Sequence, residues 1–265
     1  MVPDERCDRW LRGLEARHLA DLTFPEVSRA LRALSSAYVE RRSHLAEGAA
    51  LAGAGKRAAF ALFYGPLHYL LVRAIVRGLP GACLVDSAAQ GGRRVPTLID
   101  LGCGTGAAGA AWAAACDEPP RVIGVDRHPW AVAEAALTYG EFGLSARTRR
   151  GDIAVVPLPP SPASILAAFT VNELADAPRD VLLQRLLDRA AKGDRVLIVE
   201  PVAGFVTPWW DRWREAFVTA GGRDDQWRIP VELPAIVAKL DRAAGLHHRE
   251  LTGRSLWLPG AGLRS

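Results

Sequence analysis

The stretch from Thr97 to Gly109, TLIDLGCGTGAAG, constrains the fold of this chain more than any other. An apolar run ends at an acid, Asp100, and three glycines follow before an alanine-rich segment begins. Glycine accepts backbone angles that a side chain forbids, and it lets the chain pass close to a ligand. The pattern predicts a strand, a tight turn and a helix whose first N–H groups are free to hold a ligand.

Two classes of cofactor use such a turn. Gly102, Gly104 and Ala107 satisfy the G-x-G-x-x-A fingerprint of dinucleotide-binding proteins. Asp100 would place a carboxylate beside the phosphates of a dinucleotide, so it favours a cationic ligand instead. DLGCGTG resembles motif I of the class I S-adenosylmethionine-dependent methyltransferases. That resemblance implies S-adenosyl-L-methionine as the cofactor, held by Asp100, Gly102, Cys103, Gly104 and Gly106.

The composition sets broad limits. With 265 residues, 49% of them hydrophobic, the chain can build one large domain or a core domain with an appendage. Its formal charge is +4, but only three of the 33 basic residues are lysines. Arginine this dominant, beside so much alanine and glycine, is typical of compositional drift, so the charge is weak support for an RNA partner.

The cysteines and the N-terminus carry few further signals. No two of the four cysteines, Cys7, Cys83, Cys103 and Cys116, have C-x-x-C spacing. The sequence therefore predicts neither a zinc site nor a disulfide framework. The charged start has no apolar run behind it, so no signal peptide and a cytoplasmic location are expected. The most apolar segment, Ala58 to Val76, is interrupted by Gly65-Pro66, which makes it poor material for a membrane span.

The first part of the chain is predicted to be helical. Helices are expected over 4–20 and 25–45, and a third helical segment continues to about Gly78 with a kink or restart at Pro66. In the second helix one buried face is expected to hold Val27, Leu31, Leu34, Tyr38 and Leu45. We therefore divide the chain into an N-terminal lid or extension over 1–80, a linker over 81–96, and a cofactor-binding domain over 97–265.

From Thr97 the pattern alternates strand and helix, as in a parallel sheet with helices on both faces. Strands are expected at 97–101, 121–125, 146–150, 164–169 and 194–199, and helices at 106–116, 129–140, 178–191, 208–220 and 234–243. HHREL and SLWL read as two strands joined at Thr252-Gly253, which would make an antiparallel pair. The predicted fold class is α/β, a Rossmann-like seven-stranded methyltransferase sheet of five parallel strands plus a C-terminal antiparallel hairpin, with an α-helical N-terminal extension.

Two further acids are expected at strand ends on the crevice that the glycine turn opens. Asp126 closes the second strand, 20 residues after Gly106, where a carboxylate can accept both ribose hydroxyls. Asp152 follows the third strand, where methyltransferases of this class often bind the adenine amino group. The cofactor site is therefore predicted to include Asp126, Arg127, Asp152 and Ile153.

The segment AAFTVNELAD follows the fourth strand. Phe169 and Thr170 are expected to border the cofactor. Glu173 is a candidate base or an anchor for a substrate amine, although Asn172 and Glu173 also suit the start of a helix. No Asn-Pro-Pro-Tyr-like motif follows this strand, so the usual mark of base N-methylation within nucleic acids is missing.

Other conspicuous residues can be explained either by a structural role or by a functional one. Glu200 either supports the site or bonds backbone near Gly204. The helical spacing of Trp209, Trp210 and Trp213 favours core packing over a stacking platform. His247 and His248 have no acidic partner in sequence reach, so we assign them no chemistry.

The aromatic face before the linker supports two hypotheses. Phe60, Phe63 and Tyr64 lie at helical spacing, with His68 beside them. These residues either form core contacts between the helices and the sheet, or belong to a lid over the methyl-donor end of the crevice. In the second case Tyr64 or His68 would face the acceptor.

Several segments together resemble the small-ribosomal-subunit methyltransferase-like family, over about residues 36–258. They are AAFALFYGPLHYLLVRAIV, NELAD, LIVEP and RSLWL. The resemblance implies methyl transfer from S-adenosylmethionine, with rRNA or a ribosome-associated target as acceptor. The longer members of that family carry clustered C-terminal cysteines, which imply an iron–sulfur cluster, whereas no cysteine follows Cys116 in this chain. A small-molecule methyltransferase with a helical lid, and a non-catalytic ribosome-assembly factor, are the alternatives.

Overall fold

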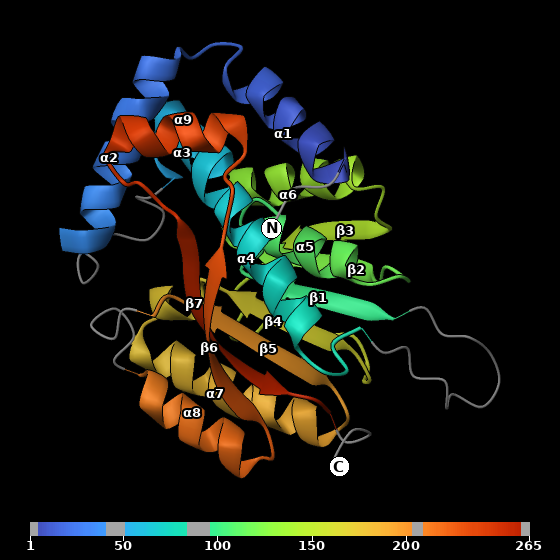
Figure 1. Cartoon of the computed structure of the whole chain (residues 1–265). Coiled ribbons are helices and arrows are strands. Elements are labelled where there is room, and N and C mark those ends of the chain that lie inside the picture. Colours follow the sequence, from blue (N-terminus) through green and yellow to red (C-terminus); the bar gives the residue numbers. More distant parts are fainter. Residues whose placement is uncertain (1–4, 41–50, 84–95, 203–208, 261–265) are drawn as a thin grey trace.

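The computed structural model describes residues 5–40, 51–83, 96–202 and 209–260. Seven strands form one sheet in the order β3-β2-β1-β4-β5-β7-β6, with helices packed on both of its faces (Figure 1). The first five strands are parallel, and β7 runs antiparallel to β5 and to β6. The predicted fold class, a Rossmann-like methyltransferase sheet with N-terminal helices, is confirmed.

The parallel strands lie within a residue or two of their predicted positions. They are β1 Thr97–Leu101, β2 Arg121–Asp126, β3 Ala146–Arg150, β4 Ser164–Ala168 and β5 Arg195–Glu200. Every residue of β4 and β5 is buried, because these central strands are covered on both faces. The β3 strand, ARTRR, lies at the edge of the sheet and is more exposed, which suits its charged sequence.

The C-terminal pair of strands differs from the prediction. A single strand, β7 Glu250–Leu258, runs through Thr252-Gly253 without a turn. Its antiparallel partner is β6 Arg223–Pro230, which the sequence analysis missed, and α9 Ala235–Ala244 connects the two. The polar sequence of β6, RDDQWRIP, gives an edge strand with no apolar run, so the periodicity that reveals buried strands is absent.

The helices within the sheet domain follow the predicted pattern closely. They are α5 Ala107–Ala115, α6 Pro129–Glu141, α7 Asp176–Ala191 and α8 Trp210–Thr219. Buried Trp209, Trp210 and Trp213 pack with Phe217, which confirms core packing for the tryptophans. The short 3₁₀ helix Val171–Glu173 precedes α7.

Helices α1 Glu5–His18 and α2 Phe24–Glu40 open the chain. Val27, Leu31 and Leu34 are buried in α2 as expected, whereas the side chain of Tyr38 and all of Leu45 lie outside the described residues. The following segment is continuous but irregular: α3 Ala54–Ala59, a π-helix Phe60–Tyr64, and α4 Gly65–Gly78. The expected restart at Pro66 is therefore a π-helical turn just before the proline, a form often found at functional sites.

Two hydrophobic clusters hold the layers together. One lies on the face covered by α7 and α8. The other joins α1, α2, α3 and α4 to α5 and the opposite face of the sheet, and includes Trp10, Leu62, Tyr69, Trp112 and Trp257. The N-terminal helices therefore share a core with the sheet.

One disulfide, Cys83–Cys116, joins the chain just after α4 to the C-terminal end of α5. The sequence analysis expected no disulfide framework, because two cysteines 33 residues apart show no pairing until the fold brings α4 and α5 together. Cys7 and Cys103 are free and buried. Ala54–Gly78 is long and apolar enough to cross a membrane, yet 78% of its most apolar window is buried inside the protein, as in the core helix of a folded domain.

Candidate functional site

The glycine turn between β1 and α5 is built as the sequence requires. Gly102, Gly104 and Gly106 have φ angles of 69°, 51° and 77°, in the left-handed region that favours glycine. A Cβ on Gly102 would lie 2.1 Å from Oγ1 of Thr170, so a larger residue there would displace the segment that follows β4. The turn is thus closely packed as well as conformationally special.

Asp100 lies beneath this turn and is fully buried. Its Oδ2 accepts hydrogen bonds from the backbone N–H of Gly109, at 3.0 Å, and from the hydroxyl of Tyr139, at 2.8 Å. Its Oδ1 is buried and has no protein hydrogen-bond partner. Burial raises the pKa of Asp100 to about 7, although both hydrogen bonds oppose that change. Asp100 therefore anchors α5 and α6 to the turn and keeps one oxygen unsatisfied.

Burial also affects the other titratable groups beneath the turn. It raises the pKa of the Cys103 thiol and that of the Tyr139 hydroxyl well above their usual ranges, and the charge of Asp100 adds to both effects. Both groups stay protonated, so Cys103 is not a reactive thiolate. Tyr139 was not singled out from the sequence, because only the fold brings α6 against β1.

Asp126 connects the end of β2 to the turn. Its Oδ2 accepts from the backbone N–H of Gly104 at 3.0 Å, and its Oδ1 accepts from that of His128 at 2.8 Å. A carboxylate offers about four acceptor positions, so two remain for a diol such as a ribose. The carboxylate is partly exposed. Its position next to the glycine turn is the one that the sequence analysis expected.

The other residues predicted for the adenosine end lie along the neighbouring strand ends. The backbone N–H of Gly151 donates to the carbonyl of Asp126, which brings the loop after β3 beside the end of β2. Asp152 is exposed, and its side chain accepts from the N–H of Ala154. Ile153 is buried, whereas Arg127 is exposed. Asp126 and the segment that holds Asp152 thus border one edge of the sheet.

Phe169 and Thr170 lie on the other side of the turn. Thr170 contacts the turn at Gly102, and Phe169 adopts a φ of 57°, which is uncommon for a residue with a bulky side chain. The ring of Phe169 stacks on His68, with centroids 3.9 Å apart and planes 11° apart. The predicted pair therefore borders both the turn and the N-terminal helices.

Glu200 positions the segment after β4. It is fully buried at the end of β5 and accepts from the backbone N–H groups of Val171 and Asn172 and from the side chain of Asn172. Glu200 thus bonds this segment; Gly204, the other suggested neighbour, lies outside the described residues. Glu173, on the same 3₁₀ helix, is exposed.

The segment Ala54–Gly78, here called the lid segment, passes over the glycine turn. A Cβ on Gly104 would lie 3.6 Å from the ring of Phe60, and one on Gly65 would lie 3.1 Å from Oγ1 of Thr105. Tyr64 and His68 both contact Phe60. Desolvation lowers the pKa of His68 to about 3, so its imidazole is neutral at physiological pH. The predicted candidates Tyr64 and His68 thus border the same space as Phe169.

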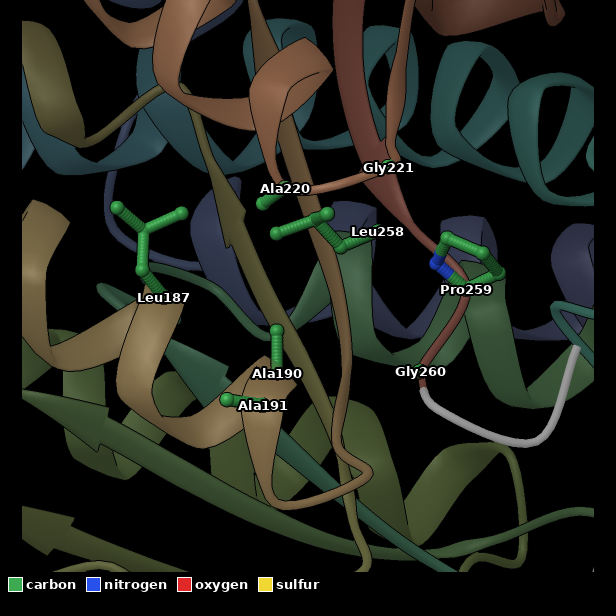
Figure 2. A pocket seen from close by; sticks show the side chains of 8 residues that line it. All are labelled: Leu187, Ala190, Ala191, Ala220, Gly221, Leu258, Pro259 and Gly260. Carbon is green, nitrogen blue, oxygen red and sulfur yellow. The ribbon is translucent and has the colours of Figure 1, made fainter. Parts of the chain in front are cut away.

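Two pockets lie outside this region. The smaller, about 70 Å³, lies between the ends of α7, α8 and β7, and no titratable side chain lines it (Figure 2). Leu258 pairs with Val196 at the start of β5. This pocket therefore lies at the N-terminal ends of the parallel strands, whereas the glycine turn lies at their C-terminal ends. The larger is lined by residues of α9 and of the connections around it, and it contains His248.

The structure corrects one interpretation there. Asp241 on α9 is the acidic partner of His248, at 2.5 Å between Oδ1 and Nδ1. The sequence analysis saw no such partner because it placed the histidines on a strand. They lie instead between α9 and β7, where the turn back from α9 brings Asp241 within reach.

Comparison with known proteins agrees with this architecture. Residues 98–193 match the model of a family described as a methyltransferase domain, and no curated protein matches the chain. The match covers the glycine turn, Asp126, Asp152 and the segment after β4. Together with the fold, it supports the predicted enzyme class, an S-adenosylmethionine-dependent methyltransferase, and with it the predicted cofactor.

Three solved structures are similar at the level of the fold. The O-methyltransferase NcsB1 from neocarzinostatin biosynthesis, in complex with S-adenosylmethionine and 2-hydroxy-5-methyl naphthoic acid, is 17% identical with a TM-score of 0.50, and the match covers 96% of this chain and 73% of that one. The N-methyltransferase NodS from Bradyrhizobium japonicum WM9, with S-adenosyl-L-homocysteine, is 12% identical with a TM-score of 0.50, covering 87% and 98%. A protein from Nostoc punctiforme PCC 73102 is 14% identical with a TM-score of 0.51, covering 92% and 72%.

Proposed function

We propose that the protein transfers the methyl group of S-adenosylmethionine to a small-molecule acceptor held beneath the lid segment. The observation that carries this proposal is the packing of the lid segment against both sides of the site. Phe60 lies over Gly104 of the turn, and His68 stacks on Phe169 after β4. A covered site of this kind suits a compact acceptor better than a long polymer.

The residues around the turn fit the cofactor. The left-handed glycines give the turn a backbone conformation that other residues rarely adopt, and Oδ1 of Asp100 is a buried acceptor without a protein partner. Asp126 retains two acceptor positions for the ribose hydroxyls. We assign cofactor binding to the residues predicted from the sequence: Asp100, Gly102, Cys103, Gly104, Gly106, Asp126, Arg127, Asp152, Ile153, Phe169 and Thr170.

S-adenosylmethionine, when bound, supplies a methyl group already activated on a sulfonium. The chain then needs mainly to align the attacking atom and to exclude water. Phe60, Phe169 and the neutral ring of His68 provide an apolar boundary for that purpose. Tyr64 and His68 are the candidates to orient the acceptor, and exposed Glu173 at the mouth is the candidate base or anchor.

The ribosomal acceptor that the sequence resemblance implied is not supported. The matching family model is a methyltransferase domain, and of the four segments that carried the resemblance it covers NELAD alone. Of the similar folds, NcsB1 was crystallised with a naphthoic acid. A small molecule is therefore the better-supported acceptor than rRNA, and the cytoplasmic location stays a prediction.

Incorporation of a labelled methyl group tests the proposal. The purified protein is incubated with radiolabelled S-adenosylmethionine and cell extract, and the products are separated into RNA, protein and metabolite fractions. We expect label in the metabolite fraction only. Label in RNA would overturn the small-molecule proposal, and co-sedimentation with ribosomal subunits without any incorporation would instead favour an assembly factor.

A further inference from the structure

One polar side chain of the lid segment lies between two aromatic rings of the site. The ring of His68 stacks on Phe169, with centroids 3.9 Å apart, and meets Phe60 edge-on at 6.2 Å. Phe60 lies over Gly104 of the turn, and Phe169 directly follows β4. His68 therefore lies between the glycine turn and the end of β4.

The ring nitrogens of His68 have no hydrogen-bond partner within the described residues. Polar side chains in such apolar surroundings are normally hydrogen-bonded, and Asp126 and Glu200 follow that rule by accepting from backbone N–H groups. His68 is partly exposed, although Phe169 covers one face of its ring. A neutral imidazole offers one donor and one acceptor. Because protein groups use neither, both are available to a ligand.

The surroundings of His68 disfavour positive charge. Desolvation lowers its pKa to about 3. The described side chains in ring contact with it are those of Phe60, Tyr64 and Phe169, and none of them is a carboxylate. Glu173 is exposed, where water screens its charge. A cationic acceptor would therefore lie beside the sulfonium of the cofactor without a counter-charge in contact, so the site suits a neutral acceptor.

We propose that the acceptor atom is the oxygen of a hydroxyl group, and that His68 holds this hydroxyl and takes its proton during methyl transfer. The inference rests on the proposed function, since it takes this site to transfer the methyl group of the cofactor. An aliphatic amine is protonated at neutral pH and then has no lone pair for attack. A hydroxyl group arrives uncharged, with its lone pairs free.

The transfer balances without a further reactant. A lone pair of the hydroxyl oxygen forms the new C–O bond while the C–S bond of the sulfonium breaks and its electron pair returns to sulfur. The hydroxyl proton passes to the free ring nitrogen of His68, and from there to water when the products leave. An oxygen that carries both a methyl group and a proton is a far stronger acid than an imidazolium ion, so a weakly basic histidine accepts this proton.

The chemical identity of the product tests the acceptor atom. The full-length protein is incubated with heat-treated cell extract and S-adenosylmethionine that carries ¹³C in its methyl group, and the metabolite fraction is analysed by NMR. The ¹³C shift distinguishes a methyl group on oxygen from one on nitrogen, carbon or sulfur. We expect O-methyl products only. Methyl groups on the other atoms would overturn this inference and leave the proposed function in place, whereas label in RNA would overturn the proposed function itself.

Variants assign the proton transfer to His68. His68→Gln keeps a hydrogen-bonding side chain of similar size but cannot take up a proton, so the rate of O-methyl product formation should fall at least ~10-fold. Imidazole added to His68→Ala, which leaves space beside Phe169, should restore part of the rate. Leu67→Met is the matched control and should keep the wild-type rate with or without imidazole. A wild-type rate in His68→Gln, or a loss in His68→Ala that imidazole cannot restore, would overturn the role of His68.

Histidine ¹⁵N NMR gives a readout that needs no turnover. The ring of His68, assigned by the signals missing from the spectrum of His68→Gln, should stay neutral as the pH is lowered from about 8 to about 5, since its pKa is about 3. A ring that takes up a proton near its ordinary pKa of 6.5 would show that the site accepts positive charge. That result would overturn the exclusion of cationic acceptors.

Discussion

Single residues in this protein take their properties from the partners that the fold supplies. Asp126 has a backbone N–H on each oxygen, so it is oriented before any ligand binds. Asp100 is held by Gly109 and Tyr139 in a fully buried position. The two acids lie near the ends of neighbouring strands; Asp126 is partly exposed, whereas Asp100 is buried beneath the turn with its Oδ1 lacking a protein partner.

Removing the Asp126 carboxylate tests the proposed cofactor-binding site. Asp126→Ala should weaken binding of S-adenosylhomocysteine by ~1–3 kcal/mol, because the ribose hydroxyls lose their acceptor. Isothermal titration calorimetry measures the change. Asp224→Ala, an exposed acid on β6, is the control and should bind as the wild type does. An unchanged constant for Asp126→Ala, or tight binding of NAD to the wild type, would place the cofactor elsewhere.

The buried carboxyl of Asp100 should make stability depend on pH. Its folded pKa of about 7 lies above the ordinary value of 3.8 for an aspartate, so the folded state keeps a proton that the unfolded chain loses as pH rises. Wild-type stability should therefore fall between about pH 4 and pH 7 through this group. Asp100→Asn keeps an oxygen acceptor without the charge.

Urea unfolding of both proteins across this range measures the effect. The unfolding free energy of Asp100→Asn should rise relative to that of the wild type by ~2–4 kcal/mol from pH 4 to pH 7. Taking the difference between the two proteins cancels every other titrating group that they share. Parallel pH curves would show that Asp100 ionises in the folded protein much as it does in the unfolded chain.

At the scale of elements, two short segments frame the proposed acceptor position. The 3₁₀ helix Val171–Glu173 is held from below by Glu200, and the π-helix Phe60–Tyr64 lies above the glycine turn. A π-helical turn widens the helix by one residue and changes which side chains face the sheet. Phe60 lies over Gly104 while Phe63 contacts the ring of His248, so this one turn packs against both the glycine turn and the connection between α9 and β7.

Conservative substitutions on the lid segment distinguish alignment of the acceptor from packing. Tyr64→Phe and His68→Gln keep most of the side-chain volume, so the melting temperature should change by less than about 3 °C. Turnover of the acceptor found in the metabolite fraction should fall at least ~10-fold, because alignment of the attacking atom dominates this chemistry. Leu67→Met is a packing control on the same segment. Wild-type rates in two stable variants would remove Tyr64 and His68 from the catalytic site.

In the whole molecule, the N-terminal helices both cover the glycine turn and form part of the hydrophobic core. The hydrophobic cluster that contains Trp10, Leu31 and Leu62 continues through α5 to Trp257 on β7. The lid and core hypotheses for the aromatic face are therefore compatible, since Phe63 is buried while Tyr64 is only partly buried. The division at 1–80, 81–96 and 97–265 stays a proposal, with residues 84–95 of the linker outside the described part of the chain.

The disulfide ties these two parts of the molecule together. Cys83–Cys116 closes a loop across 33 residues, and such a link restricts the unfolded chain. Reduction should lower the unfolding free energy by about 3–4 kcal/mol on the loop-entropy model. Urea unfolding with and without a thiol reductant measures it. The double variant Cys83→Ser/Cys116→Ser should show the lower stability and no response to reductant; a wild type equally insensitive to reductant would contradict the prediction.

Local signals in the sequence were enough for the parallel half of the fold and for the glycine turn of the candidate cofactor site. Buried parallel strands have continuous apolar runs, and the glycine turn needs backbone angles that only glycine adopts easily, so both appear within a few neighbouring residues. Asp126 was predictable for a related reason, because one helix and one strand return the chain to the same edge of the sheet.

Contacts between distant segments were decided only by the tertiary structure. The polar edge strand β6, the Cys83–Cys116 disulfide, the bonds from Tyr139 to Asp100 and from Glu200 to Asn172, and the pairing of Asp241 with His248 all join groups with no shared local pattern. The sequence by itself determined which cofactor turn the chain can build, because backbone geometry is local. Which side chains meet above that turn depends on how α4 and α9 pack, and packing is a property of the whole chain.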